Sequence, residues 1–226
     1  VETVMRGLEP VLAGAKISEV NQRRSDLRFP LPERFAERLV GRRMERLSRR
    51  AKYILGHLDS GEVLAIHLGM TGRFSIDPGK KEKHSSKKQL GEFTHEAGHD
   101  NRHDHVVIRT AAGAVITYND ARRFGYMSLI PGDTLAAHPH FAKLGIEPLG
   151  NELSGAFLSE VAAGREADLK AFLMDQRIIA GLGNIYVCEA LHRAGLSPTL
   201  AAGALGRRST KATHAAEALA ASIRQV

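Results

Sequence analysis

The segment DQRIIAGLGNIYVCEAL, residues 175–191, places two glycines between apolar runs that have helical spacing. Gly181 and Gly183 permit a tight turn, and we expect Asn184 to cap the helix that follows. Two helices that meet at such a turn present free backbone N–H groups and the positive end of a helix dipole, which suit a phosphate. An ordinary helical hairpin has the same pattern. The segment therefore predicts two helices joined by a glycine turn and leaves the ligand open.

Helical patterning extends from this segment in both directions, from Ser154 to the end of the chain. The apolar spacing predicts four helices, at residues 157–163, 168–176, 185–194 and 209–225. The proline-containing residues 132–150 precede them and predict a linker. We therefore expect an all-α domain over residues 151–226.

The residues before the linker have a different pattern. Short apolar runs separated by turn pairs such as Ser60-Gly61 are typical of a β-sandwich. The clearest expected strands are residues 53–58, 63–68, 106–109 and 114–118, and helices are expected over residues 1–12 and near residues 32–40. The polar, Lys- and His-rich residues 77–102 predict a long surface loop. The sequence thus predicts an α+β fold of two domains, with the β-sandwich over residues 1–131.

The overall charge is basic. Thirty-two Lys and Arg residues against 25 Asp and Glu residues give a formal net charge of +7. Such a surface attracts polyanions such as nucleic acid in a salt-sensitive way, although a basic enzyme without that partner has the same balance. No run approaches the roughly 18 apolar residues of a membrane helix, and no signal segment opens the chain. We therefore expect a cytoplasmic, nucleoid-associated protein without a membrane partner.

One cysteine is present, Cys188, which excludes an intramolecular disulfide and a cysteine-based zinc site within these residues. Its apolar neighbours predict a buried, inert thiol.

Two predicted loops carry side chains suited to nucleic acid. YNDARRFGY, residues 118–126, lies between two expected strands; its arginines can hold phosphates or base edges, and Phe124 can wedge into a base stack. A salt-bridged turn with Phe124 in the core is the alternative. In HLGMTGRF, residues 67–74, Met70 stands between two glycines, where its side chain would protrude, although an isolated methionine is more often in the core. Lys52 begins a strand in RRAKYIL and is either solvated or a catalytic acid or amine.

Together these segments resemble the formamidopyrimidine-DNA glycosylases over essentially the whole chain. The matching segments follow the family's order: VETVMRGLEP (1–10), RRAKYIL (49–55), HLGMTG (67–72), HDHVV (103–107), DARRFG (120–125), LGIEPLG (144–150) and LMDQRIIAGLGNIY (173–186). The resemblance implies a β-sandwich followed by a helix–two-turn–helix domain. That architecture agrees with the one expected from periodicity.

The resemblance implies damaged double-stranded DNA as the partner, bound by a monomer. It places Met70, Arg122 and Phe124 in the gap left by a flipped nucleotide, with Arg122 facing the orphaned base. Extruding a base costs a few kcal/mol, and residues that refill the stack offset that cost. The resemblance also assigns contacts with the DNA backbone to four residues: His103, Arg165, Lys170 and Asn184.

The implied activity is excision of oxidised purines (formamidopyrimidine and 8-oxoguanine), followed by β,δ-elimination at the abasic site. Lys52 aligns with the lysine that assists elimination, and Glu2 with an acidic position beside the lesion pocket. Family members carry PELPE before VET, with its terminal proline as nucleophile and its glutamate as acid, so we expect both to be missing from a chain that starts at Val1. They also end in a four-cysteine zinc ribbon. We therefore expect no cofactor in this chain and one structural Zn²⁺ in the full-length enzyme.

The polar loop poses a separate question. His95, His99, Asp100 and His103 have a spacing that could bind a transition metal. No expected strand or helix frames them, so a solvated insertion without metal is the expectation. Five lysines there offer nonspecific DNA affinity instead: Lys80, Lys81, Lys83, Lys87 and Lys88.

Three other functions stay open at this point. A non-catalytic damaged-DNA-binding fragment is favoured by the absence of PELPE. An endonuclease VIII-type glycosylase would act on oxidised pyrimidines, although VET and DARRFG resemble the formamidopyrimidine branch. A helix–turn–helix regulator would leave the β domain without a role.

Overall fold

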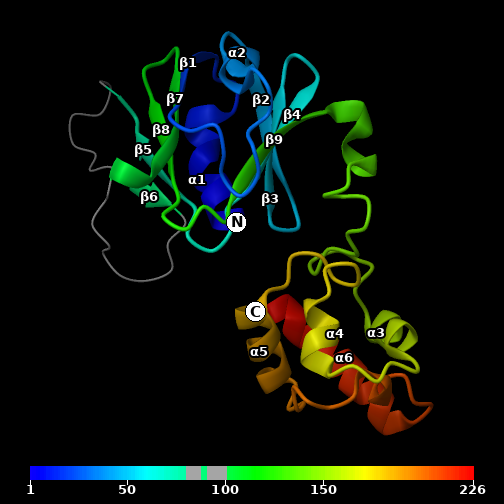
Figure 1. Cartoon of the computed structure of the whole chain (residues 1–226). Coiled ribbons are helices and arrows are strands. Elements are labelled where there is room, and N and C mark those ends of the chain that lie inside the picture. Colours follow the sequence, from blue (N-terminus) through cyan, green and yellow to red (C-terminus); the bar gives the residue numbers. More distant parts are fainter. Residues whose placement is uncertain (80–87, 91–100) are drawn as a thin grey trace. The chain divides into compact units, whose positions relative to one another are not determined.

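The computed structural model describes residues 1–79, the backbone of residues 88–90, and residues 101–226 (Figure 1). They form two compact units, Val1–His138 and Pro139–Val226. The division falls inside the predicted linker 132–150. Part of that segment is regular, because Gly132–Ala137 form a 3₁₀ helix, η2, directly after the last strand.

Two antiparallel sheets build the first unit, one with strand order β1-β7-β8-β5-β6 and one with order β2-β3-β4-β9 (Figure 1). The strands are β1 Ile17–Gln22, β2 Met44–Arg50, β3 Tyr53–Leu58, β4 Glu62–His67, β5 Arg73–Asp77, β6 Lys88–Leu90, β7 Asp104–Thr110, β8 Val115–Asn119 and β9 Tyr126–Pro131. The expected strand 53–58 is β3, residue for residue. The other three expected strands differ from β4, β7 and β8 by one or two residues at their ends.

The prediction of a continuous loop over residues 77–102 is wrong at β6. This three-residue strand pairs with β5, with Phe74 opposite Leu90. Backbone hydrogen bonding to a sheet edge requires no particular side chains. A strand of three residues is also too short to show the alternating pattern from which strands are predicted.

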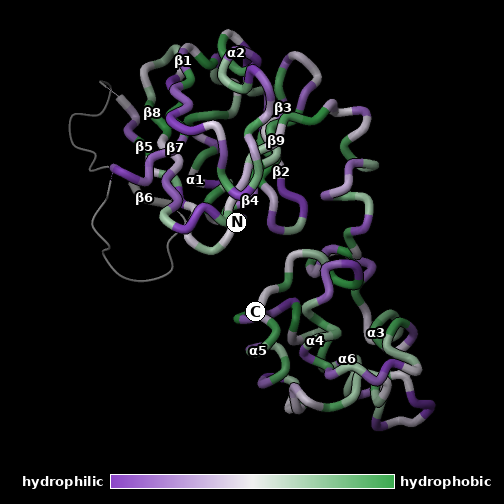
Figure 2. Tube along the Cα trace, in the orientation of Figure 1, coloured by the Kyte–Doolittle hydropathy of each residue, from purple (hydrophilic) through white to green (hydrophobic). Residues whose placement is uncertain are grey.

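A single hydrophobic core joins the two sheets to helix α1 (Glu2–Leu12). Val4, Leu8 and Leu12 recur every four residues and therefore lie on one helix face, where each is at most 3% exposed. Burying a side chain of this size contributes about 1.5–3 kcal/mol. The trace coloured by hydropathy shows β3, β4 and β9 of the four-stranded sheet as largely hydrophobic (Figure 2). A short helix, α2 (Phe35–Leu39), covers the same core within the expected helical region 32–40.

The second unit is helical, with α3 Gly155–Ala162, α4 Leu169–Met174, α5 Asn184–Arg193, α6 Thr210–Gln225 and the 3₁₀ helix η3 Ala202–Ala204. Ser154 and Ser209 cap α3 and α6, because their hydroxyl oxygens accept backbone N–H groups at 3.0 and 3.2 Å. The four helices share their own buried core. The predicted α+β fold, a β-sandwich followed by a helical domain, is confirmed. Among the residues placed by the structure, no helix combines the length and the apolar character needed to cross a membrane.

Candidate functional site

The loop of residues 120–125 joins β8 to β9 and is built around the carboxylate of Asp120, which is fully buried. One carboxylate oxygen accepts hydrogen bonds from the Tyr118 hydroxyl (3.1 Å) and the Gly125 N–H (2.9 Å), and the other accepts one from the Thr71 hydroxyl. A buried carboxylate is tolerated when its oxygens are bonded in this way. Burial and the Asp120 charge raise the pKa of Tyr118, so its hydroxyl keeps its proton as a donor. These bonds fix both ends of the loop.

Residues 68–72 form a second turn, between β4 and β5, that lies against the first. The N–H of Gly72 donates across this turn to the carbonyl four residues earlier (2.9 Å). Gly69 has a φ of +65°, a conformation that glycine adopts without strain. A Cβ at Gly69 would lie 2.5 Å from backbone atoms of Phe124 and Gly125. The two turns are therefore in backbone contact, which requires glycine at this position.

Three predicted DNA-contacting residues come together on these two turns; we call Met70, Arg122 and Phe124 the wedge cluster. Met70 is 75% exposed and Phe124 is 42% exposed, so both project from the surface. The Arg122 guanidinium lies over the Phe124 ring, 4.4 Å from its centroid, and its Nη1 lies 3.8 Å from the Met70 sulfur. The alternative that placed Phe124 in the core is wrong, although this turn does form an ion pair, between Arg123 and Asp26 (3.9 Å).

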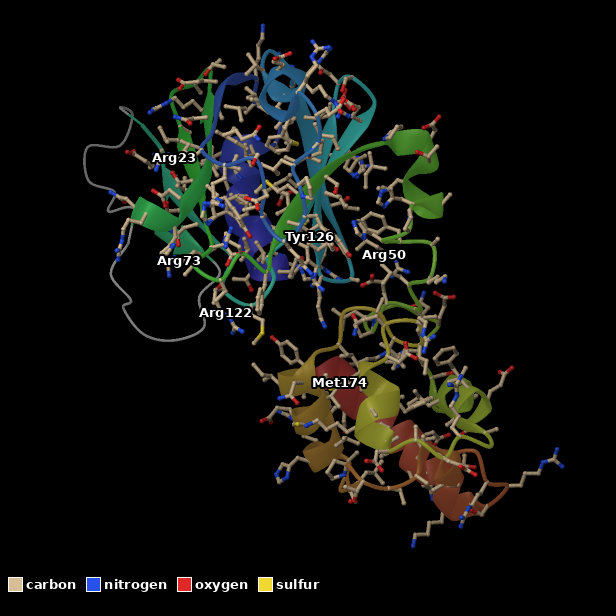
Figure 3. The ribbon with its side chains drawn as sticks, viewed as in Figure 1. Arg23, Arg50, Arg73, Arg122, Tyr126 and Met174 are labelled. Carbon is tan, nitrogen blue, oxygen red and sulfur yellow. The ribbon has the colours of Figure 1, made fainter. Side chains whose placement is uncertain are left out.

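Aromatic side chains pack together at the strand ends next to the two turns. Tyr126 lies at the start of β9 (Figure 3). It stacks on His67, at the end of β4, with centroids 5.2 Å apart and planes 11° from parallel. The Tyr126 hydroxyl is hydrogen-bonded to that of Tyr53 on β3. Packed rings of this kind restrict the strand ends from which both turns emerge.

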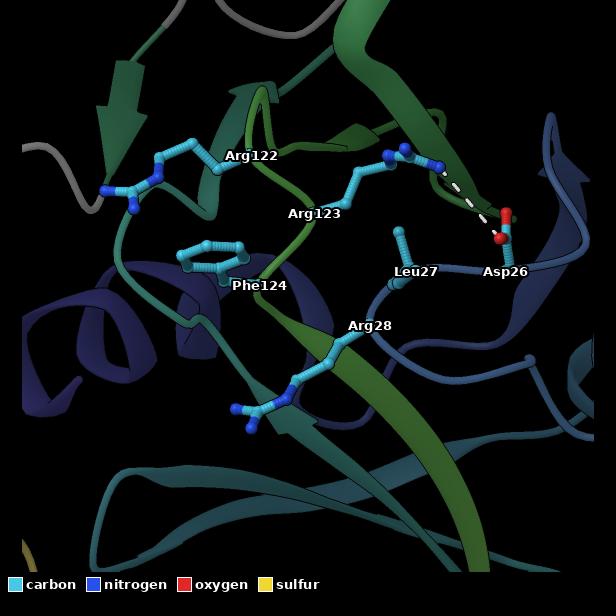
Figure 4. A pocket seen from close by; sticks show the side chains of 6 residues that line it. All are labelled: Asp26, Leu27, Arg28, Arg122, Arg123 and Phe124. Carbon is cyan, nitrogen blue, oxygen red and sulfur yellow. Dashed lines mark ion pairs between the residues drawn. The ribbon is translucent and has the colours of Figure 1, made fainter.

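A pocket of about 480 Å³ opens beside the wedge cluster, between the loop of residues 120–125 and the segment around Leu27 (Figure 4). Three arginines line it, Arg28, Arg122 and Arg123. The Asp26 carboxylate lies 3.9 Å from Arg123 and offsets part of their charge. A basic pocket beside an exposed ring is suited to an anionic or planar group.

The predicted residues Glu2 and Lys52 are linked through Arg49. Glu2 accepts hydrogen bonds from Arg49 (2.9 Å) and Arg6 (2.8 Å), and Arg49 also donates to the carbonyl of Ala51, next to Lys52 (2.9 Å). Burial opposes the charge of Glu2, but the two arginines outweigh it and lower the pKa of its carboxyl. Lys52 is half-buried in the turn between β2 and β3, and desolvation lowers the pKa of its amine. The pair thus combines an ionised acid with an amine that loses its proton more readily than a solvated lysine.

The lowered pKa of Lys52 predicts a pH-dependent cost in stability. Below the folded-state pKa, burial disfavours the charged amine; above the unfolded value of 10.5 the amine is neutral in both states and this cost disappears. Lys52→Met should therefore unfold at a higher temperature than the parent at pH 7, with a smaller difference at pH 10. Thermal unfolding at both pH values measures this. If the variant were less stable than the parent at pH 7, burial of the charged Lys52 amine would not be a cost to stability that is tolerated for function.

In the second unit, the glycine turn between α4 and α5 is organised by Gln176. Its side-chain NH₂ donates to the carbonyls of Met174 (3.0 Å) and Leu182 (2.8 Å), and its Oε1 accepts the N–H of Gly181 (2.9 Å). Gly181 has a φ of +100°, so a side chain there would be strained. The turn is held by three bonds to one amide group, and α5 starts directly after it.

Two expectations for this segment are wrong. Gly183, not Asn184, occupies the N-cap of α5, and no side-chain capping bond from Asn184 occurs within residues 101–226. The helix includes Asn184 as its first residue, and its exposed side-chain oxygen accepts a weak hydrogen bond from the Cys188 thiol one turn further on (3.9 Å). Cys188 is exposed, not buried, because Val187 and Leu191 form the buried face while Cys188 lies on the face of Asn184, one turn away.

The remaining predicted phosphate contacts lie on both units. His103 is half-buried in the 3₁₀ turn η1 (Asn101–His103). Its backbone carbonyl accepts the Asp120 N–H (3.0 Å), so it borders the loop of residues 120–125. Arg165 is exposed, donates to the Val161 carbonyl (3.0 Å) and lies 5.9 Å from the centroid of the Phe172 ring. Lys170 is half-buried in the first turn of α4.

The predicted metal cluster lies mostly outside the described residues. His95, His99 and Asp100 belong to the part of the chain that is not described, as do Lys80, Lys81, Lys83 and Lys87. Where the structure places side chains, no group of three or more His, Cys, Asp or Glu residues could hold a metal ion.

Sequence reasoning assigned no role to four residues that shape these sites: Arg49, Thr71, Asp120 and Gln176. Each acts through hydrogen bonds to the backbone or to a side chain distant in sequence. Asp120 stood in the quoted segment DARRFG, and an aspartate at the start of a loop is a familiar backbone acceptor. That signal identifies a loop-forming residue, but it does not identify the Thr71 hydroxyl on the neighbouring turn.

Comparison with known proteins gives the same division of the chain. Residues 1–127 match the formamidopyrimidine-DNA glycosylase N-terminal domain, and residues 144–225 match the formamidopyrimidine-DNA glycosylase H2TH domain. The chain is 55% identical to the formamidopyrimidine-DNA glycosylase of Methylocella silvestris and 56% identical to that of Methylobacterium nodulans, in each case over 100% of the chain and 75% of the relative.

Solved structures agree with these relatives. The Lactococcus lactis glycosylase non-covalently bound to DNA containing an abasic site has a TM-score of 0.77 at 26% identity, over 99% of this chain and 77% of that one. A second complex of the L. lactis protein with abasic-site DNA has a TM-score of 0.76 at 27% identity, over 99% and 74%. With both domains matched in order and relatives more than half identical over its entire length, this chain belongs to the formamidopyrimidine-DNA glycosylase family.

Proposed function

We propose that this chain is the DNA-binding body of a base-excision repair glycosylase that flips out and excises oxidised purines, formamidopyrimidine and 8-oxoguanine among them. The observation that carries the proposal is the wedge cluster. Three side chains with different chemistry, a flexible thioether, a guanidinium and an aromatic ring, project together from two turns in backbone contact.

The wedge cluster suits the energetics of base extrusion. Unstacking and unpairing a nucleotide costs a few kcal/mol, least for a damaged or missing base. An aromatic ring inserted in its place restores stacking worth about 1–3 kcal/mol. Phe124 supplies such a ring, Met70 fills the irregular remainder, and Arg122 offers planar donors to the base left without a partner. The wedge cluster is therefore expected to bind more tightly to a duplex in which a base is already missing from the stack.

We assign the contacts with the DNA backbone to four residues: His103, Arg165, Lys170 and Asn184. At the start of α5, Asn184 is exposed together with Ile185 and Tyr186, which are 63% and 42% exposed. The first N–H groups of an α-helix have no partner within the helix and favour an anion. The net charge of +7 adds the long-range attraction that a duplex binder requires.

Lys170→Ala tests the proposed contacts with the DNA backbone separately from the wedge cluster. Removing one phosphate contact should weaken binding to damaged and intact duplex equally and make the slope of log affinity against log salt shallower by about one unit. The control is Lys16→Ala. Lys16 is exposed and directly precedes Ile17, which pairs with Thr110 at the end of β1 that lies away from the loop of residues 120–125. Affinity titrations at four salt concentrations measure both. An unchanged slope for Lys170→Ala would remove it from the phosphate contacts.

We assign the chemistry of the abasic-site lyase to the region of Glu2 and Lys52. Lys52 would move protons during β,δ-elimination, since a lowered amine pKa brings such a group closer to working pH. The resemblance places the nucleophile in the proline of a PELPE segment preceding VET, whose secondary amine would form an iminium with the sugar. It also places a structural Zn²⁺ in a four-cysteine ribbon. The present residues, with Cys188 as their one cysteine, do not supply that ligand set, and no step here depends on it.

Two measurements test the proposed function. The first is the affinity of this chain for a duplex with one abasic site relative to the same intact duplex; a ratio near one would refute lesion recognition. The second is incubation with the abasic duplex and borohydride, followed by peptide mapping of any covalent adduct. An adduct supports the lyase and identifies its amine. Lesion preference without an adduct favours a recognition fragment, and excision of oxidised pyrimidines in preference to purines would favour the endonuclease VIII type.

A further inference from the structure

Thr71 links the two turns that carry the wedge cluster. Its hydroxyl donates a hydrogen bond to Asp120 Oδ1 (2.5 Å) and accepts the backbone N–H of Arg122 (3.3 Å). Thr71 follows Met70 directly in the chain, so one side chain ties the Met70 turn to the Arg122 loop. We propose that Thr71, with Asp120 behind it, is a positioning residue that holds the two halves of the wedge cluster in register for lesion recognition. The inference rests on the proposed function.

The chemistry of the link requires a hydroxyl. A hydroxyl donates one hydrogen bond and accepts others at the same time, whereas a methyl group of similar size does neither. The bond to Asp120 is charge-assisted and therefore stronger than a neutral one. The second carboxylate oxygen of Asp120 is held by Tyr118 and Gly125, so the acceptor is itself fixed in place.

The other contacts between the two turns constrain them less. The Arg122 Nη1 to Met70 sulfur approach is 3.8 Å long and exposed, and thioether sulfur is a weak acceptor. The close packing of Gly69 on Phe124 and Gly125 prevents the turns from approaching further but does not stop them from sliding. Residues that act together at a site must be held to within about 0.5 Å by their supporting contacts. The Thr71 hydroxyl supplies this constraint across the turns.

A positioning role and a merely structural role of Thr71 predict different results. Its side chain is half-buried at a turn and does not belong to the hydrophobic cluster of the first unit, but its hydroxyl donates to the fully buried Asp120 carboxylate. Loss of the hydroxyl should therefore cost stability in either case. Only a positioning role predicts a selective loss of lesion preference as well, whereas a merely structural threonine would leave the affinity ratio unchanged.

The experiment compares Thr71→Val, Thr71→Ser and a control, Thr134→Val, in this same chain. Valine keeps the β-branched shape without the hydroxyl, and serine keeps the hydroxyl. Thr134 is exposed on η2, and its hydroxyl donates to the Pro131 carbonyl (3.2 Å). Each variant is measured for the ratio of its affinities for abasic and intact duplex, and for its melting temperature.

Thr71→Val should lower the affinity ratio about tenfold while affinity for intact duplex stays within about twofold. Because the change also removes a donor from the buried Asp120 carboxylate, its melting temperature should fall by several degrees. Thr71→Ser and Thr134→Val should keep the ratio within about twofold. The inference is overturned if Thr71→Val keeps the ratio, if Thr71→Ser loses as much as Thr71→Val, or if Thr71→Val melts lower and loses affinity for both duplexes alike. A parent chain without lesion preference would overturn the proposed function as well, whereas a preference that survives Thr71→Val overturns this inference alone.

Discussion

Phe124→Ala is expected to lower the preference of the chain for an abasic duplex about 10- to 100-fold while affinity for intact duplex stays within about twofold. The ring is 42% exposed and covered on one face by the Arg122 guanidinium at 4.4 Å, so its removal leaves the sandwich core untouched. Base–aromatic stacking is worth about 1–3 kcal/mol, which sets the expected range. Competition titrations with the two duplexes measure the preference.

Phe29→Ala is the matched control for this change. Like Phe124, Phe29 is exposed (46%) and has a guanidinium over its ring, that of Arg28, 5.5 Å from the centroid. Its ring also packs edge-on against Tyr126, with centroids 5.1 Å apart. Phe29 is not part of the wedge cluster, so its removal should lower the preference much less than Phe124→Ala does. Equal losses on damaged and intact duplex in Phe124→Ala would exclude Phe124 from the wedge.

Gly125→Ala is expected to produce the second large effect, by forcing the two turns apart. A Cβ at Gly125 would lie 1.9 Å from the Tyr118 hydroxyl and 2.7 Å from the His67 carbonyl oxygen, both fixed by surrounding structure. Relieving that overlap should lower the free energy of unfolding of the first unit by about 3 kcal/mol and abolish lesion preference. Urea denaturation and the duplex titrations measure the two effects.

Gly113→Ala separates this clash from the general cost of replacing a loop glycine. Gly113 has a φ of +94°, and nothing lies within 4 Å of its added Cβ, so only backbone strain of about 1 kcal/mol is expected. Lesion preference should be kept. If both variants lost the same stability, the close approach at Gly125 would not be a constraint on the wedge.

The fold was predictable because both units depend on regular patterns. A short apolar run bounded by turn residues predicted β3 residue for residue, and helical spacing predicted every long helix of the second unit. The three-residue strand β6 was not predictable, because pairing at a sheet edge through backbone bonds leaves no pattern in the side chains.

The residues of the candidate site were predictable, but their contacts with one another were not. The residues of the wedge cluster came from segments that resemble a known family, but their mutual contact depends on pairing between β5 and β8, which spacing in the sequence does not encode. The errors at Asn184 and Cys188 arose from a shift of one residue in the start of α5 and from the orientation of one helix face. Thr71 and Asp120 were missed because their bond joins residues 49 positions apart.

The central claim is that the wedge cluster enters the duplex where a nucleotide is missing, and fluorescence of 2-aminopurine opposite an abasic site tests it most directly. This base is quenched when stacked and brightens when its stacking is disturbed. Saturating the abasic duplex with the parent chain should raise the 2-aminopurine emission. Saturating it with Phe124→Ala should raise the emission far less. Saturation of the abasic duplex by the parent without any change in emission would contradict insertion of the wedge.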